Sequence, residues 1–73
     1  MQYDNLGLYI KEKRKKLGVS LNKFAFDNNI EPAILSRIEN LKQGIKVDVA
    51  VKIASGFKQT LGEFITEFEK QNN

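Results

Sequence analysis

The stretch that decides the fold is NNIEPAILSRIEN, residues 28–40. Proline is favoured at the first position of a helix, where its missing N–H is not needed, so a helix is expected from Pro32 to about Leu41. Its apolar side chains share one side, which is expected to be buried: Ile34, Leu35, Ile38 and Leu41. The opposite stripe has no negative charge and no bulky apolar group, and it consists of Ala33, Ser36, Arg37 and Asn40. The function depends on what this outer stripe contacts.

A second short helix is expected directly before this one. Ser20 is a favourable N-cap for a helix from Leu21 to about Asn28, and Asn29 tolerates the positive φ angle of a tight turn. Two short helices joined by so tight a turn cannot run antiparallel over a long overlap, so they cross steeply, as in a helix-turn-helix. In that arrangement the second helix projects its outer stripe, and an α-helix fits the major groove of DNA. The motif is expected to span residues 21–41.

The remaining segments also show helical signals. The first helix is expected over Leu6–Leu17, with Leu6, Ile10 and Leu17 on one side and the basic run KEKRKK, residues 11–16, outside. Gly18 follows, where a left-handed cap costs little. A fourth helix is expected from about Val47 to Phe57, with apolar residues at 47, 50, 51, 54 and 57. A capping box at residues 60–63 opens a fifth helix with apolar residues at 61, 64, 65 and 68.

The fold class is therefore all-α, with five helices in a single domain of 73 residues and a frayed tail at 70–73. The chain contains no cysteine and no histidine, which excludes disulfides, thiolate metal sites and a histidine general base. The acidic residues are spread over helix starts and outer faces, and no glycine-rich phosphate loop follows a strand. We therefore expect no enzymatic activity, no cofactor and no small-molecule substrate.

Charge is distributed unevenly along the chain. The net charge is +3, but residues 1–46 carry nine basic and five acidic residues, whereas residues 47–73 carry three and four. A basic N-terminal part suits a polyanion partner, and a solvated lysine-rich face explains it equally well. Nothing resembles a signal peptide, and no apolar run approaches the roughly 20 residues needed to span a bilayer. A cytoplasmic protein with no membrane contact is expected.

The sequence resembles the Cro/CI-type (XRE-like) helix-turn-helix domain of bacterial and phage repressors. The resemblance runs without gaps from Leu6 to about Phe64, on the segments LGLYIKEKRKKLGVS, FAFDNNI, LSRIEN and VKIASGFKQTLGEF. It implies a lambda-repressor-like fold, sequence-specific binding of double-stranded DNA by a transcriptional regulator, and a homodimer. It also implies a structural ion pair between Arg14 and Glu39.

The resemblance assigns DNA-contacting roles to eight residues. The base-reading positions are Ala33, Ser36 and Arg37, of which Arg37 has bidentate potential toward guanine. The phosphate-contacting positions are Ser20, Asn40, Lys42 and Gln43, with Lys23 as a contact on the flank. Helix capping remains an alternative role for Ser20 and Asn40. Ile65 and Phe68, near the C-terminus, are candidates for a dimer contact.

A different class of function also fits this sequence, namely a helix-turn-helix fold that serves as a protein-interaction module, such as an anti-repressor or an antitoxin component. Leu21 and Pro32-Ala33 stand where the family commonly has polar DNA-contacting residues, and Phe26 is expected to face outward. These residues favour a protein partner, whereas Arg37 and the basic N-terminal part favour DNA. The two functions do not exclude each other.

Overall fold

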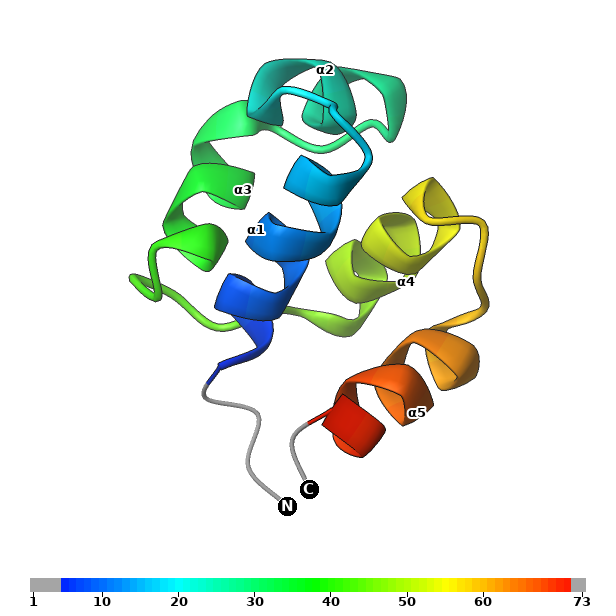
Figure 1. The fold of residues 1–73 in the computed structure, drawn as a ribbon. Helices are drawn as coiled ribbons and strands as arrows, with labels where there is room; N and C mark the ends of the chain where they lie inside the picture. The colour runs from blue at the N-terminus through cyan, green and yellow to red at the C-terminus, as the bar shows by residue number, and fades with distance from the viewer. Residues whose placement is uncertain (1–4, 72–73) are drawn as a thin grey trace.

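The computed structural model describes residues 5–71, and this part of the chain contains five helices and no strand (Figure 1). The all-α fold predicted from the sequence is confirmed. The helices are α1 (Leu6–Lys16), α2 (Leu21–Asp27), α3 (Pro32–Glu39), α4 (Val47–Gly56) and α5 (Leu61–Gln71). The pair α2 and α3 packs together at one end, α3 packs against α1, and α5 packs against α4. As a result α1 lies between the α2–α3 pair and the α4–α5 pair.

Four helices end in the same backbone motif. One residue after the C-cap has a positive φ angle in each: Gly18 (72°), Asn29 (58°), Leu41 (59°) and Lys58 (59°). The following N–H then donates back into the helix, as from Ile30 to the Ala25 carbonyl at 2.8 Å. This is the Schellman motif, which satisfies carbonyls that the helix end leaves unpaired. The left-handed caps predicted at Gly18 and Asn29 are confirmed, and α3 ends at Glu39, two residues earlier than predicted.

The core is a single cluster to which all five helices contribute. Its aromatic part connects α1, α2 and α5 with Phe57, the residue that follows α4. The ring centroids of Phe24 and Phe57 are 4.9 Å apart, and those of Tyr9 and Phe68 are 5.3 Å apart. Such tilted pairs add to the stabilisation that comes from burial alone. Phe64 is buried, as the fifth-helix periodicity predicts.

Two apolar residues that the sequence places on buried sides are exposed. Leu17 is 56% exposed, because it is the C-cap of α1 and lies beyond the last helical turn. Leu41 is 49% exposed, because its positive φ angle takes it off the buried side of α3. On α4, Val47 and Val51 are also exposed, and Ile53, which the predicted apolar positions did not include, is buried instead.

The C-terminal expectations also need correction. Phe68 was a candidate for a dimer contact, but it is fully buried against Tyr9. Lys70 and Gln71 were expected in a frayed tail, but they form the last turn of α5. Residues 72–73, the rest of that tail, lie outside the described residues.

A buried ion pair joins α1 to the end of α3. The guanidinium of Arg14 donates from Nε to Glu39 Oε2 at 2.8 Å and from Nη2 to Glu39 Oε1 at 2.9 Å. Its Nη1 donates to the Val19 carbonyl at 2.7 Å, just before α2. Every nitrogen of this buried guanidinium therefore has a partner, and the hydrogen bonds to Glu39 raise the pKa of Arg14 further. The pair expected from the family resemblance is present, and it orients α3 relative to α1 and to the start of α2.

A second polar cluster joins α1 to α5. Lys13 Nζ contacts Glu67 Oε2 at 2.6 Å, the Tyr9 hydroxyl donates to the same carboxylate, and Gln59 Nε2 donates to Glu67 Oε1 at 3.1 Å. The lysine, followed by the tyrosine, stabilises the charged carboxylate and lowers the pKa of Glu67. Burial and the neighbouring carboxylate raise the pKa of Tyr9, so its hydroxyl remains a donor.

Removal of the Glu39 carboxylate tests the first pair. In Glu39→Ala the guanidinium of Arg14 stays buried without a counter-charge, and we expect the free energy of unfolding in urea to fall by about 3–5 kcal/mol. The double variant Arg14→Met/Glu39→Leu removes both charges and is expected to recover most of this loss. Glu12→Ala, at an exposed position of α1, serves as the control and should change stability by less than about 0.5 kcal/mol. A double variant as unstable as Glu39→Ala would contradict this account.

Acid titration tests the second cluster. A carboxylate whose pKa is lower in the folded state than in the unfolded chain stabilises the fold above its ordinary pKa, and this contribution is lost as the pH falls through the folded value. We therefore expect Glu67→Gln to remove part of the fall in stability below about pH 4. About a third of the Glu67 side chain is exposed, so solvent screening keeps the effect below about 1 kcal/mol. Urea midpoints measured between pH 7 and pH 3 would show this smaller loss of stability. A fall in the midpoint of Glu67→Gln equal to that of the unmodified protein would contradict the prediction.

Candidate nucleic-acid interface

The outer stripe of α3 lies on the surface of the molecule. Leu35 and Ile38 point into the core, and Ile34 is partly buried. On the other side Ala33, Arg37 and Asn40 are exposed, and Ser36 is half-buried. Figure 1 shows α3 at one edge of the fold, with no other element over its outer side. The structure therefore brings the base-reading candidates together on one accessible strip.

The polarity of this strip is neutral to positive. Arg37 is its charged residue, and no described acidic side chain forms an ion pair with it. Its Nε donates instead to Oε1 of Gln43, at 2.7 Å, in the loop after α3. The Nη1 and Nη2 groups form no hydrogen bond with the described residues, so the outer edge of the guanidinium is available to a ligand. Sequence reasoning named both residues but gave no indication that they contact each other.

Asn40 acts as a helix cap in the structure. It is the C-cap of α3, and its Nδ2 donates to the Ser36 carbonyl at 2.8 Å and lies 3.4 Å from Ser36 Oγ. Both contacts of the amide nitrogen therefore stay within the helix, and an external acceptor would replace the longer one, to Ser36 Oγ. Ser36 is correspondingly less available, because part of its hydroxyl is taken up by the cap.

Ser20 and Lys23 lie at the start of α2. The Ser20 hydroxyl oxygen accepts from the Lys23 backbone N–H at 3.2 Å, which makes it the N-cap and leaves its own O–H as a donor. The Lys23 ammonium lies 2.9 Å from Asp27 in an exposed pair one helical turn apart. Such a surface pair is weak, so Asp27 reduces the field of Lys23 without fixing its side chain.

Lys42 is exposed in the loop that follows α3, and its backbone N–H donates to the Arg37 carbonyl at 2.7 Å. The eight candidate residues thus fall into two adjoining groups. One group lies on and just after α3 (Ala33, Ser36, Arg37, Asn40, Lys42 and Gln43), and the other lies at the start of α2 (Ser20 and Lys23). Figure 1 shows α2 at the top of the fold and α3 running down one side from it, so the two groups are carried by the two motif helices.

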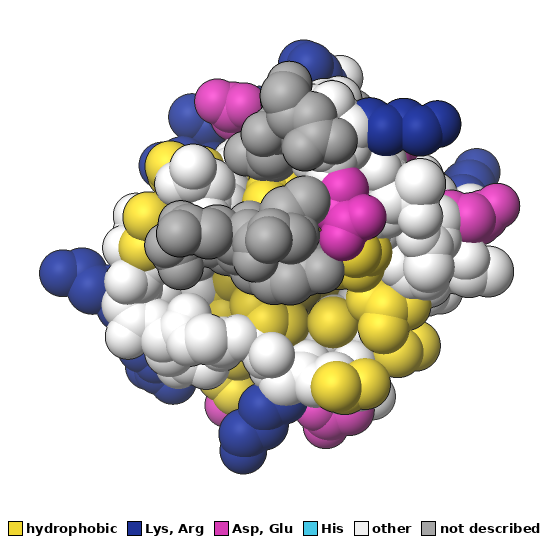
Figure 2. All heavy atoms as spheres, turned by 90° about the horizontal axis from the view of Figure 1, so that it is seen from below, with side chains coloured by type: hydrophobic (Ala, Val, Ile, Leu, Met, Phe, Trp, Pro, Cys, Tyr) yellow, Lys and Arg dark blue, Asp and Glu magenta, His cyan; other side chains and the backbone are white. Residues whose placement is uncertain are grey.

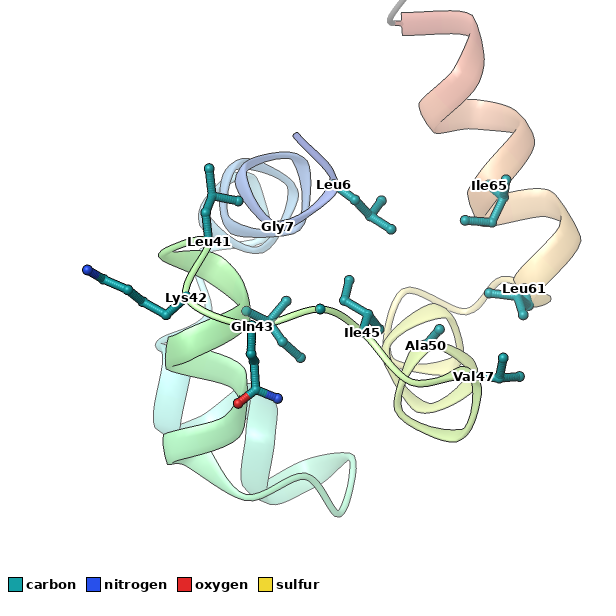
Figure 3. Close-up of a pocket in the computed structure, with 12 residues that line it drawn as sticks. Leu6, Gly7, Leu41, Lys42, Gln43, Ile45, Val47, Ala50, Leu61 and Ile65 are labelled. Atoms are coloured by element: carbon teal, nitrogen blue, oxygen red, sulfur yellow. The ribbon is translucent and has the colours of Figure 1, made fainter. Parts of the chain in front are cut away.

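An apolar groove lies beside the end of α3, and the sequence analysis did not anticipate it. Its volume is about 730 Å³, and it is bounded by α1, the end of α3, the α3–α4 loop, α4 and α5 (Figure 3). Its apolar lining includes Leu6, Leu41, Ile45, Val47, Leu61 and Ile65. Figure 2, which views the molecule from below, shows hydrophobic side chains gathered at the centre of a face, with basic and acidic side chains around them. The sequence signal was three apolar residues in or beside a loop, at positions 41, 45 and 47.

Another exposed apolar residue lies away from the groove. Phe26 on α2 is 85% exposed, in agreement with the expectation that it faces outward. A single exposed aromatic side chain is common on protein surfaces, but one this exposed on a motif helix is compatible with a partner that covers it.

Comparison with known proteins identifies the family. The family model described as helix-turn-helix matches residues 10–64, which is more than half of the chain and includes both motif helices. No curated protein and no solved structure matches the chain. None of the helices in residues 5–71 has both the length and the apolar character of a membrane span. The chain belongs to the helix-turn-helix family of the Cro/CI (XRE-like) type, and it is a DNA-binding regulator of that class.

Proposed function

We propose that this protein binds double-stranded DNA at specific sequences, with α3 in the major groove. The observation that carries the proposal is the outer strip of α3, which lies on the surface, has no negative charge and carries an arginine with an open guanidinium edge. The major groove presents a distinct pattern of donors and acceptors for each base pair and is wide enough for a helix. An acidic or sealed strip would not suit this role.

The three base-reading roles differ in strength. Arg37 is the main reader, since the two terminal nitrogens of its guanidinium match O6 and N7 of guanine in a bidentate contact. Ala33 is small and apolar, which suits the methyl group of thymine. Ser36 contributes least, because its hydroxyl is half-buried and shared with Asn40. Base readout is thus concentrated on one strong residue.

The phosphate contacts position α3 on the duplex. The donors that remain after the internal hydrogen bonds are the Ser20 hydroxyl, the amide of Gln43 and the ammonium of Lys42, and Asn40 joins them where a phosphate replaces its longer contact to Ser36 Oγ. Lys23 adds a cation on the flank. Contacts of this kind fix the register of a protein on DNA without reading its sequence.

We also propose that the protein binds as a homodimer, because one small module with a single strong base reader binds weakly. A symmetric pair would contact two half-sites about 34 Å apart. Ile65 remains a candidate for the contact between copies, since it is only partly buried and lines the apolar groove. The buried Phe68 is not a candidate.

A protein-interaction module is the second candidate function. It is favoured by the exposure of Phe26 and by the apolar groove, whose hydrophobic lining has no role in the proposed DNA contacts, although Lys42 and Gln43 also line it. An anti-repressor or an antitoxin component would use such surfaces. The DNA experiment described next discriminates between the two functions.

Binding to duplex DNA is expected to weaken steeply with salt, with a slope of log affinity against log salt of about −0.9 for each phosphate neutralised. A duplex selected from a random library at near-physiological salt provides the specific probe, and dissociation constants come from fluorescence anisotropy. Arg37→Ala should cost about 1–3 kcal/mol on the selected duplex and much less on random duplex.

Lys58→Ala is the matched control, because it removes one positive charge from the turn after α4 and away from α3. It should affect both duplexes equally and slightly. Weak binding with little salt dependence would favour the protein-interaction module. An equal loss on both duplexes in Arg37→Ala would make Arg37 a phosphate contact.

A further inference from the structure

We propose that Gln43 is a positioning residue that holds Arg37 in the orientation in which it reads its base. This inference rests on the proposed DNA-binding function and gives Gln43 a role beyond a phosphate contact. The two residues belong to different parts of the chain, since Arg37 lies in the last turn of α3 and Gln43 in the loop that follows. Specificity at one base pair then depends on a residue that does not touch the base.

The geometry fixes which end of the glutamine faces the arginine. Arg37 Nε donates to Gln43 Oε1 at 2.7 Å, and both side chains are exposed. Amide oxygen and nitrogen are often hard to tell apart, but a guanidinium has only donors, so its partner atom must be the oxygen. The NH₂ end of Gln43 therefore points away from Arg37 and is left as a donor.

This orientation of the Gln43 amide gives the two side chains different roles. With Nε engaged, the Nη1 and Nη2 edge of Arg37 remains for O6 and N7 of guanine. The Gln43 NH₂ group remains for an acceptor, which a phosphate oxygen provides. A continuous chain of hydrogen bonds then runs from the base through Arg37 and Gln43 to the DNA backbone. The phosphate contact that fixes the position of the protein on the DNA therefore also fixes the orientation of Arg37.

The backbone holds Gln43 in place for this task. The Schellman motif at the end of α3 turns the chain through Leu41, and the Lys42 N–H donates to the carbonyl of Arg37 itself at 2.7 Å. Figure 3 shows the Gln43 side chain extending from the loop back along α3. A long arginine side chain loses rotamer freedom when it binds, and a partner that already restricts it in the free protein reduces that loss.

The test is a double-variant cycle on two duplexes. The first is the duplex selected from the random library by the unmodified protein, and the second has its Arg37-dependent G·C pair replaced by A·T. Gln43→Ala is expected to weaken binding to the selected duplex about fivefold, because both the positioning of Arg37 and the phosphate contact are lost, and to the substituted duplex only about twofold, because there the phosphate contact alone is lost. In the Arg37→Ala background, Gln43→Ala should weaken binding to both duplexes by the same factor of about two, again through the phosphate contact alone.

The same factor for Gln43→Ala in both backgrounds would overturn the inference and leave Gln43 as a phosphate contact only. That failure differs from failure of the proposed function, in which the unmodified protein would not discriminate between the duplexes or Arg37→Ala would weaken binding to both equally. Lys42→Ala, one residue away, is the control for backbone contacts. It should weaken binding to both duplexes by similar factors and reduce the salt slope by about one.

A second variant separates the two ends of the glutamine. Gln43→Glu keeps an acceptor for Arg37 but replaces the donor with a negative charge, so we expect weaker binding to every duplex with the preference for the G·C pair retained. In the free protein, the ¹⁵Nε order parameter of Arg37 should fall in Gln43→Ala and remain unchanged in Lys42→Ala. An order parameter that Gln43→Ala does not change would also overturn the inference.

Discussion

The buried contact between Arg14 and Glu39 is the interaction on which the rest of the structure depends. A single guanidinium binds the carboxylate at the end of α3 in two places and the carbonyl of Val19 before α2 in a third. The ion pair therefore links α1 to the end of α3 and to the start of α2, the two helices of the motif. Because charged groups are costly to bury, the pair is stable only when all of its hydrogen bonds are made together. One arrangement of α1, α2 and α3 is thereby favoured over the alternatives that apolar packing alone would tolerate.

This constraint explains how so short a helix presents a usable surface. An isolated helix of eight residues is unstable in water, so α3 exists only because its inner side is packed and its end is tied down. The residues of the outer strip are then not needed to hold α3 in place, apart from Asn40, which caps the helix and contacts Ser36. In the proposed binding mode, Arg37 is oriented by the loop that follows α3, so recognition would depend on how α3 ends as well as on the residues of its outer strip.

Much of the fold was predictable because its signals are local or periodic. Pro32, Ser20 and the capping box at residues 60–63 mark helix starts, and the box forms as predicted, with Thr60 and Glu63 exchanging hydrogen bonds. The left-handed caps at Gly18 and Asn29 were also predictable, but the last residues of α1 and α3 were not, because the apolar periodicity of the sequence continues after the backbone has turned. Leu17 and Leu41 look like the next apolar position of a helix, yet each lies past the last turn.

The candidate site was predictable as a set of residues but not as an arrangement. Helical spacing places Ala33, Ser36 and Arg37 on one strip without further information. The contact of Arg37 with Gln43 depends on the path of an irregular loop, for which the sequence has no periodic signal. The groove likewise requires four helices and a loop to meet around one space. The structure therefore adds most to the sequence prediction at contacts between segments that are distant along the chain.

The glycine at position 7 has a consequence for how far the recognition strip extends from the body of the protein. A β-carbon there would lie 2.0 Å from the backbone oxygen of Ile38, so the two helices touch through bare main chain. Any larger side chain would act as a spacer that moves α3 outward and tilts it. In the proposed DNA-binding mode, the depth to which the outer strip enters the groove would therefore depend on the missing β-carbon in the first turn of α1.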